Sequence, residues 1–385
     1  MLFVTRKFPP QTGGMETLAK DTFDALLAGG SRVTLLRNVR SDWHSWWWLP
    51  LTLWRMHQVL RRSGAERPDV VLLGDALMNA VGTWLLRLHR MPHATMVMGL
   101  DVTFDSSVYR KIVVRHLRAA PLIIAISDAT ARAVRAAGVE DEHLRVLRLS
   151  VVPPDDMAPR EVARAELRRR FDVPDDTVVL VTVGRLVRRK GVAWFAAQVL
   201  PAVTRPTPDR QDGLRLVHLV AGAGPAEDRI RRVARSKGLE GTVRLLGRVD
   251  DPTRELLLRG ADLFVQPNIH VYGDMEGFGL VNVEAAVRDL PVLAADIDGI
   301  PDAVVDGETG WLVTSQDAPR WRRRLREVLA DPDALATQGR RFGATARDLY
   351  SADRFAATLH DLLEGVARGD VTARELHEER NLNRS

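Results

Sequence analysis

Two carboxylates lie eight positions apart in Glu276-Gly277-Phe278-Gly279-Leu280-Val281-Asn282-Val283-Glu284, with two glycines between them. We predict that a helix begins near Val281, so the glycines lie just before its first turn, where unpaired N–H groups and a partial positive charge favour a phosphate. Glu276 would then lie in the loop over the phosphate, and Glu284 about one to two turns inside the helix. This arrangement suits a sugar nucleotide, with one carboxylate for the sugar hydroxyls and the other for the ribose. The alternative is an ordinary loop and a core helix, with both glutamates solvated.

The composition is that of a folded soluble protein, with 45% hydrophobic and 27% charged residues. A length of 385 residues predicts two domains. The absence of cysteine excludes disulfides, thiolate metal sites and cysteine nucleophiles. The net charge is +5, but only five of the 55 basic residues are lysines and the arginines are mixed with acids. We therefore expect no nucleic-acid partner, whereas diphosphates or an acidic lipid surface stay open as partners.

The ends and the hydropathy of the chain predict where it acts. Met1-Leu-Phe-Val4 begins at once as a strand, without the charged and apolar regions of a secretory signal. The sequence contains no run of about 18 apolar residues, so we expect no membrane-spanning helix. We expect a cytoplasmic protein.

Apolar strands alternate with amphipathic helices along the whole chain, which predicts an α/β fold of two Rossmann-like parallel sheets facing a cleft. The expected strands are 2–5, 32–36, 70–73, 94–98, 122–126, 178–183, 214–220, 243–246, 263–265, 292–294 and 310–313. The expected helices are 16–28, 49–62, 78–88, 107–119, 128–137, 160–170, 192–203, 226–237, 252–259 and 280–288. Val151-Val-Pro-Pro-Asp-Asp156 breaks the alternation and reads as the linker.

Three segments follow from this pattern. Residues 1–155 form an N-terminal Rossmann-like acceptor domain, and residues 156–350 a C-terminal Rossmann-like domain for the nucleotide-sugar donor. Residues 351–385 supply a C-terminal helix that packs back toward the N-terminal domain, followed by a polar tail that frays.

The glycine-bearing loops share one placement, at the carboxyl ends of expected strands, where ligands of parallel sheets bind. They contain Gly13-Gly14, Gly99, Gly184, Gly222-Gly224 and Gly277-Gly279. Gly13 and Gly14 permit close approach of the backbone to a ligand, although they would also serve an ordinary tight turn.

Gly184-Arg185-Leu-Val-Arg188-Arg189-Lys190-Gly191 follows an expected strand and precedes a helix. Arg185 and Lys190 would point into the cleft and neutralise a leaving diphosphate. Arg188 and Arg189 are expected to be solvated. A wholly solvated basic loop is the alternative.

Two other motifs carry less chemistry. Gly222-Ala-Gly224 resembles the opening of a dinucleotide fingerprint, but the third small residue and the acid about 20 positions on are missing. We interpret it as a glycine turn that lines the nucleotide side. Asp296-Ile-Asp298 has no further ligand at metal spacing, so we predict no metal and no other cofactor.

The first half offers acceptor-side candidates in one turn, Met98, Gly99 and Asp101, and Asp101 is preferred among the acids that follow its strands. Asp101, in Met98-Gly99-Leu-Asp101, follows an expected strand and could orient a hydroxyl or act as a base.

Five of the nine tryptophans fall within Trp43-His-Ser-Trp-Trp-Trp-Leu-Pro-Leu-Thr-Leu-Trp54, which we name the tryptophan segment. Core packing is one interpretation. The other is peripheral contact with the inner face of a membrane or with a lipid-linked acceptor, since tryptophan favours that boundary.

Nearly the whole chain resembles the retaining glycosyltransferases of the GT-B fold, specifically family 4. The most specific motifs are Glu276-Gly-Phe-Gly-Leu280 with Glu284, Gly184-Arg185 with Lys190, and Asp298-Gly-Ile-Pro-Asp302 with Gly307-Glu-Thr-Gly310; Gly13-Gly14 and Gly99-Leu-Asp101 agree in the first half. The resemblance implies transfer of a sugar from a UDP- or GDP-linked donor to a hydroxyl acceptor without a metal, on the same face of the sugar, with the leaving phosphate assisting the incoming hydroxyl.

The resemblance also implies residue roles. Arg185 and Lys190 hold the diphosphate and Glu284 the ribose. Glu276 contacts the donor sugar, together with backbone N–H groups of Phe278, Gly279 and Leu280.

The chain departs from the family at Met98, where many relatives have histidine, and a thioether donates no hydrogen bond. This departure supports a rival interpretation, a non-catalytic sugar-nucleotide-binding or regulatory homologue. A third interpretation, a nicotinamide oxidoreductase, rests only on Gly222 and Gly224.

Overall fold

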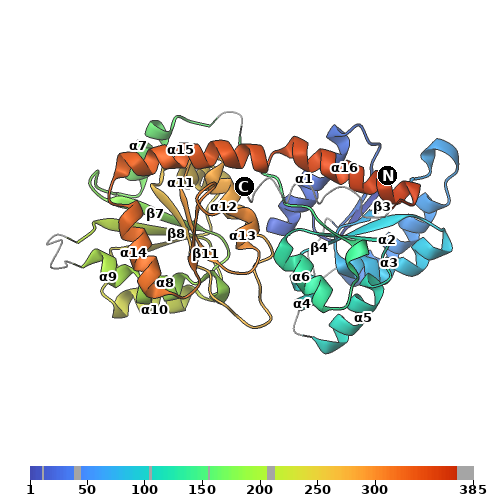
Figure 1. The fold of residues 1–385 in the computed structure, drawn as a ribbon, viewed down its shortest axis with the longest axis horizontal. Helices are drawn as coiled ribbons and strands as arrows, with labels where there is room; N and C mark the ends of the chain where they lie inside the picture. The colour runs from blue at the N-terminus through green and yellow to red at the C-terminus, as the bar shows by residue number, and fades with distance from the viewer. Residues whose placement is uncertain (11–12, 39–44, 104–105, 155–156, 206–212, 371–385) are drawn as a thin grey trace. The chain divides into compact units, whose positions relative to one another are not determined.

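A computed structural model of the chain describes residues 1–10, 13–38, 45–103, 106–154, 157–205 and 213–370. The chain divides into two compact units, Met1–Ser150 with Ala352–Ser385, and Val151–Ser351 (Figure 1). The divisions lie at residues 150 and 351, against 155 and 350 in the sequence-based expectation. Residues 155–156 and the tail from residue 371 lie outside the described residues.

The first unit contains a parallel sheet of six strands in the order β2-β1-β3-β4-β5-β6. The strands are β1 (Leu2–Thr5), β2 (Thr34–Arg37), β3 (Val71–Leu73), β4 (His93–Val97), β5 (Leu122–Ala125) and β6 (Leu144–Val146). Every residue of β1, β3, β4 and β5 is buried, because helices cover both faces of the sheet. Strands of this kind read as continuous apolar runs, which is why the sequence predicts them well.

The helices of the first unit are α1 (Gly14–Ala28), α2 (Ser45–Leu60), α3 (Ala76–Leu88), α4 (Leu100–Thr103), α5 (Ser107–Leu117), α6 (Asp128–Ala136) and α16 (Ala352–Arg368), with short 3₁₀ turns η2 (Gly64–Glu66) and η3 (Asp141–His143). Helices α2 and α3 share one apolar core with β1 and β3, and α3, α5 and α6 share another with β4 and β5. Helices α1 and α16 pack against each other, on the other side of the sheet from α3 and α5 (Figure 1).

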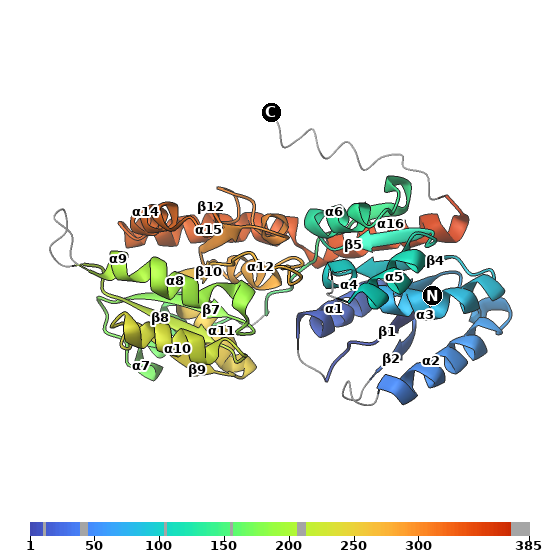
Figure 2. The ribbon, with the colours of Figure 1, turned by 90° about the horizontal axis from the view of Figure 1, so that it is seen from below.

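The second unit repeats the architecture with the strand order β12-β11-β10-β7-β8-β9, again parallel (Figure 2). Its strands are β7 (Val178–Val183), β8 (Leu216–Ala221), β9 (Val243–Gly247), β10 (Leu263–Gln266), β11 (Val292–Asp296) and β12 (Trp311–Thr314). Its helices are α7 (Arg160–Arg170), α8 (Val192–Gln198), α9 (Leu200–Thr204), α10 (Glu227–Ser236), α11 (Asp251–Gly260), α12 (Leu280–Ala286), α13 (Ile300–Ala303), α14 (Ala318–Val328) and α15 (Pro332–Leu349), with η4 (Arg188–Lys190).

The structure differs from the expected elements at a few places. The expected helix 192–203 is divided into α8 and α9, because Pro201 lacks an N–H and its ring blocks a continuous helix. The short strand β6, with one buried residue, was not predicted, and neither were α14 and α15. Among the described helices, none has the length and apolar content needed to cross a bilayer.

Candidate active site

Three loops of the second unit meet at one edge of its sheet. Strands β10, β7 and β8 are neighbours, and they run parallel, so the loops that follow them lie side by side. These loops contain residues 184–191, 222–226 and 267–279. Their predicted site residues are thereby brought to the same edge of the sheet.

The loop after β7 is fixed by close backbone packing. Gly191 has a positive φ of 67°, and a Cβ atom there would lie 1.8 Å from the Pro267 carbonyl oxygen. The Ile269 N–H donates to the Arg189 carbonyl at 2.8 Å, which ties the loop after β7 to the loop after β10. At its other end, a Cβ on Gly184 would lie 3.9 Å from Lys190 Cε. The side chain of Lys190 therefore passes beside a residue that has none.

Glu276 is the centre of a buried charge network. Its Oε2 accepts from Lys190 Nζ at 2.6 Å, from Arg189 Nη1 at 2.7 Å and from Asn268 Nδ2 at 3.0 Å. Arg189 Nε also donates to Asp274 Oδ1 at 2.9 Å. Three donors thus converge on one carboxylate oxygen, and no hydrogen bond from the described residues reaches Oε1.

These contacts set the charge states. Burial acts to raise the pKa of Glu276, but the charges of Lys190 and Arg189 outweigh it and hold that pKa at about 2. Burial lowers the pKa of Lys190, although Glu276 opposes this shift. Glu276 is therefore ionised at neutral pH, and its charge compensates two buried cations.

The backbone of Glu276 is clamped on both sides by the loop after β11. The Glu276 N–H donates to Asp298 Oδ2 at 3.0 Å, and Gly299 N–H donates to the Glu276 carbonyl at 3.0 Å. A Cβ on Gly299 would lie 2.1 Å from the Gly277 carbonyl oxygen, so only glycine permits this approach. The carboxylate is held by its side-chain partners and by its backbone at the same time.

One expectation about the basic loop is wrong. Arg189 is buried and paired with Glu276 and Asp274, because η4 turns its side chain toward the loop after β10. Arg188 is exposed, as predicted, and Arg185 is exposed as well. Sequence reasoning thus missed Arg189, Asn268 and Asp274, and it gave Asp298 no contact with Glu276.

The glycines after β8 serve loop packing. A Cβ on Gly222 would lie 1.8 Å from the Gly184 carbonyl oxygen, and one on Gly224 would lie 2.4 Å from the Leu186 carbonyl oxygen. The Ala226 N–H donates to Leu186 O at 2.8 Å. These glycines let the loop after β8 lie directly against the loop that carries Arg185 and Lys190.

The glycine-bracketed turn leads into α12 as predicted. Gly279 is the N-cap with a positive φ of 83°, and α12 begins at Leu280. Phe278 is buried and packs edge-on against Tyr350, with ring centroids 6.1 Å apart. Gly277 contributes the carbonyl that approaches Gly299.

Glu284 lies inside α12 and forms an ion pair with Arg254 of α11. Its side chain is 14% exposed, so it is accessible at one side. Arg254 lies in a stretch with no motif, and the sequence gives no sign of this pairing.

Several buried polar atoms beside the network have no hydrogen-bond partner among the described residues. They are Gln266 Nε2 and Oε1, Asn268 Oδ1 and Asn282 Oδ1. A Cβ on Gly279 would lie 2.8 Å from Asn282 Nδ2 and 3.4 Å from Gln266 Nε2, so these groups surround the glycine turn. Buried polar groups without partners cost about 1–3 kcal/mol each, which favours their pairing with a ligand or water.

The acceptor-side candidates lie together in the first unit. Gly99 has a positive φ of 82°, and the turn lets the Met98 N–H donate to Asp101 Oδ2 at 3.0 Å. Arg6 Nε donates to Asp75 Oδ2 at 3.0 Å, and Asp75 caps α3. Burial and the charge of Asp75 raise the pKa of Asp101 to about 6, although the Met98 N–H and Arg6 oppose them. Asp101 is a carboxyl poised to change charge near neutral pH.

The turn at Gly13 and Gly14 begins α1, as predicted. The carboxylate of Glu16 folds back over Gly13, where a Cβ would lie 2.5 Å from Glu16 Oε2. Lys7 Nζ lies 3.8 Å from Glu16 Oε1. Sequence reasoning missed Glu16, which lies over the glycine that was expected to approach a ligand.

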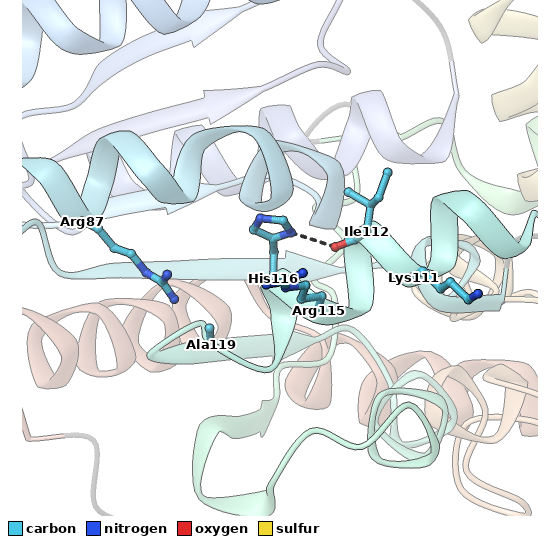
Figure 3. A pocket seen from close by; sticks show the side chains of 6 residues that line it. All are labelled: Arg87, Lys111, Ile112, Arg115, His116 and Ala119. Atoms are coloured by element: carbon cyan, nitrogen blue, oxygen red, sulfur yellow. Dashed lines mark hydrogen bonds between the residues drawn. The ribbon is translucent and has the colours of Figure 1, made fainter.

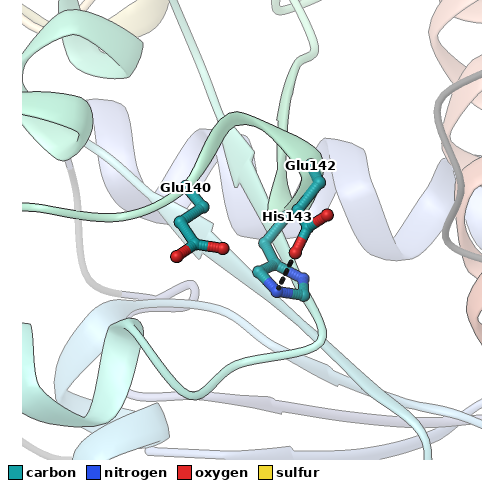
Figure 4. A group of neighbouring side chains, drawn as sticks. All are labelled: Glu140, Glu142 and His143. Atoms are coloured by element: carbon teal, nitrogen blue, oxygen red, sulfur yellow. Dashed lines mark ion pairs between the residues drawn. The ribbon is translucent and has the colours of Figure 1, made fainter.

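One group of side chains has metal-like spacing within the part of the chain that the structure describes. Glu140, Glu142 and His143 gather at η3, before β6 (Figure 4). His143 pairs with Glu142 at 3.4 Å and bonds to the Pro121 carbonyl at 3.0 Å. The two glutamates are exposed, and the group precedes its strand, whereas Asp101 follows a strand of the same sheet, so we assign no metal to it.

Known proteins identify the family. The family described as glycosyl transferases group 1 matches residues 163–348, and the glycosyl transferase 4-like domain matches residues 6–150. The chain belongs to these GT-B glycosyltransferases. The two matches cover every site residue named above and all strands of the two sheets except β1.

Curated relatives are similar over part of their length. A GDP-mannose-dependent alpha-(1-6)-phosphatidylinositol monomannoside mannosyltransferase of Mycobacterium tuberculosis is 33% identical over 240 residues, which cover 59% of this chain and 57% of the relative. A D-inositol 3-phosphate glycosyltransferase of Corynebacterium aurimucosum is 34% identical over 174 residues, covering 45% of this chain and 39% of the relative. This GT-B chain therefore spans less than two thirds of the relatives it matches.

Solved GT-B structures show the same fold at lower identity. HepE of Anabaena in complex with UDP has a TM-score of 0.71 at 19% identity, covering 94% of this chain and 99% of that one. Sucrose-phosphate synthase of Thermosynechococcus elongatus has a TM-score of 0.74 at 19% identity, covering 96% and 99%.

Proposed function

We propose that the protein is a hexosyltransferase that moves a sugar from a UDP- or GDP-linked donor to a hydroxyl acceptor, with retention and without a metal. The observation that carries the proposal is the Lys190–Glu276–Arg189 network at the carboxyl edge of the second sheet. It combines fixed cations with a carboxylate whose second oxygen is left for a ligand. Family membership and the names of the curated relatives support sugar transfer.

In the proposed reaction the bond between the anomeric carbon and the diphosphate oxygen breaks. The acceptor oxygen bonds to that carbon on the same face, and its proton passes to the leaving phosphate. Lys190 and Arg185 stabilise the negative charge that develops on the diphosphate. Glu276 Oε1 accepts from sugar hydroxyls, and Glu284 accepts from the ribose.

Polar groups beside the network add to donor binding in this proposal. Gln266 and Asn282 are buried with unpaired atoms around Gly279. Hydroxyls of a bound sugar would form hydrogen bonds with these atoms. The site should therefore bind a sugar nucleotide more tightly than a nucleotide without a sugar. In the first unit, Asp101 orients the acceptor hydroxyl in its ionised form.

The acceptor class is drawn from the relatives. One curated relative is named for a phosphatidylinositol monomannoside and another for inositol 3-phosphate. We propose a lipid-linked or polyol hydroxyl acceptor. A cytoplasmic location with peripheral membrane contact through the tryptophan segment belongs to the same proposal.

A panel of UDP- and GDP-sugars tests the proposal by thermal shift and by transfer in the presence of EDTA. A donor at a hundred times its Kd should stabilise the fold by about 2.7 kcal/mol. Donor binding with neither hydrolysis nor transfer, across acceptors, would instead favour the non-catalytic homologue, which Met98 supports.

A further inference from the structure

Three helices of the first unit carry no acidic residue. They are α2, α3 and α5, with 16, 13 and 11 residues. Acids make up 50 of the chain's 385 residues, so an average composition would place several in helices of this combined length. The basic side chains Arg55, Arg87, Lys111 and Arg115 are all exposed on them. The outer surface of this helical layer is therefore positive, and we name it the α2–α3–α5 face.

Large apolar side chains project from the same surface. Trp84 and Leu88 of α3 are 58% and 64% exposed, Trp54 of α2 is 58% exposed and Ile112 of α5 is 50% exposed. Trp84 and Leu88 are four residues apart, so they lie on one side of α3. Helix α3 packs between α2 and α5, which brings the side chains of all three helices onto one layer.

A basic pocket opens between α3 and α5. It has a volume of about 720 Å³ and is lined by Arg87, Lys111, Ile112, Arg115, His116 and Ala119 (Figure 3). No carboxylate lines it, and none of the described carboxylates pairs with Arg87, Lys111 or Arg115. His116 Nδ1 bonds to the Ile112 carbonyl, so its ring is held within α5. Cations with no internal counter-charge favour an external anion.

The structure describes the side chains of two tryptophans of the tryptophan segment, Trp48 and Trp54. Trp48 is half-buried, packs against the core of α2 and α3, and donates through Nε1 to the Arg37 carbonyl at 3.1 Å. Trp43 and the side chains of Trp46 and Trp47 lie outside what the structure describes. Trp54 is the tryptophan of this segment that is shown on the surface.

We propose that the α2–α3–α5 face docks on an anionic lipid bilayer. Trp54, Trp84, Leu88 and Ile112 enter the headgroup boundary, where tryptophan and aliphatic side chains are favoured. Arg87, Lys111 and Arg115 bind lipid phosphates at the mouth of the pocket. The α2–α3–α5 face combines basic side chains with exposed apolar ones, and its three helices contain no acid. These properties are complementary to the anionic and apolar groups of a lipid bilayer.

This inference deepens the membrane contact proposed above and rests on that part of the proposed function. It extends the contact from the tryptophan segment to a surface of three helices, which includes Trp54. It does not depend on the donor site of the second unit, so each idea can fail alone.

Co-sedimentation with vesicles tests the surface. The full chain is mixed with vesicles of phosphatidylcholine, alone or with about a third phosphatidylglycerol. We expect binding to the anionic vesicles, release at high salt, and little binding to the neutral ones. The charge reversal Arg87→Glu/Lys111→Glu/Arg115→Glu should lower the bound fraction at least tenfold.

Matched controls separate the surface from general charge and hydrophobicity. Arg229→Glu/Arg232→Glu/Lys237→Glu makes the same charge change on exposed positions of α10 and its end, and it should leave binding unchanged. Trp84→Gln should weaken binding, whereas Val162→Gln, at a position that is also 58% exposed, should not. Circular dichroism confirms that each variant is folded.

The inference would be overturned if the two triple variants reduced vesicle binding equally, or if the wild-type protein stayed in the supernatant. It would also be overturned if the protein bound no vesicles and formed a dimer in solution that Trp84→Gln dissociates. Thermal shift with sugar nucleotides is run on the same samples. Vesicle binding without donor binding would count against the transferase proposal alone, and the reverse result against the docking surface alone.

Discussion

Lys190 Nζ and Glu276 Oε2 lie 2.6 Å apart in the second unit, and both side chains are about nine-tenths buried. A buried ion pair adds little net stability, but removing one partner leaves an uncompensated charge. The pair therefore stabilises the loop after β7 and also contributes the charges proposed to bind the donor, so one substitution affects both.

The first prediction separates these two roles. Glu276→Gln should lower the free energy of unfolding by about 3 kcal/mol or more, since Lys190 and Arg189 lose a buried counter-charge. It should also reduce transfer by more than a hundredfold. The double variant Lys190→Met/Glu276→Gln should recover part of the stability and remain inactive, as measured by thermal denaturation and donor turnover. Recovery of activity in the double variant would show that the pair is only structural.

The second prediction concerns Gly191. Gly191→Ala should destabilise the protein strongly and abolish donor binding, because the new Cβ would lie 1.8 Å from Pro267 O. Gly238→Ala is the matched control, since Gly238 has the same φ of 67° with no atom within 4 Å of its Cβ position. Gly238→Ala should lower the free energy of unfolding by only about 1–2 kcal/mol, the cost of a left-handed backbone for alanine, and it should leave donor binding intact. Equal stability losses in calorimetry would contradict the tight packing.

The third prediction is a pH dependence of stability. The pKa of Asp101 is raised from 3.8 to about 6. A raised acid pKa means that its contribution to stability is complete below about pH 4 and is lost as the pH rises through about 6, amounting to about 3 kcal/mol. Asp101→Asn removes this titration. Between pH 4 and 7 the free energy of unfolding of the wild type should therefore fall relative to that of the variant. Denaturant unfolding at several pH values measures both free energies. If the two free energies of unfolding depended on pH in the same way, the raised pKa of Asp101 would be refuted.

The same carboxyl gives a kinetic expectation. If the ionised form orients the acceptor, transfer should rise through about pH 6 in the wild type and stay flat and low in Asp101→Asn. Donor binding should be unaffected in both.

The fourth prediction concerns Glu284, which Arg254 holds in an ion pair. Glu284→Gln should raise the KM for the donor roughly tenfold with little change in kcat, since the proposed ribose contact is equal in ground and transition states. Glu240→Gln is the control, because Glu240 is an exposed glutamate in a turn and also pairs with an arginine, Arg235. A fall in kcat at constant KM would assign Glu284 another role.

The sequence predicts the strands and the glycine turns because their signals are local. Leu2–Thr5 and Val178–Val183 are apolar runs, and Gly279 precedes a helix as its spacing indicates. The network of Glu276 is less predictable, because Asn268 and Asp274 come from a loop stretch with no motif of its own. Asp298 begins a recognised motif, but its spacing gives no sign that it accepts from the Glu276 N–H. Arg189 was misplaced since neighbouring residues of one basic loop differ only in the direction that η4 gives their side chains.

In the proposed function, the second unit binds a nucleotide diphosphate through Lys190 without a metal. Isothermal titration of UDP and GDP, in EDTA, into wild type and Lys190→Met tests it most directly. We expect one-to-one binding of at least one diphosphate to the wild type and at least tenfold weaker binding to a folded Lys190→Met variant. Binding that needs a divalent cation, or equal affinity in the two proteins, would contradict it.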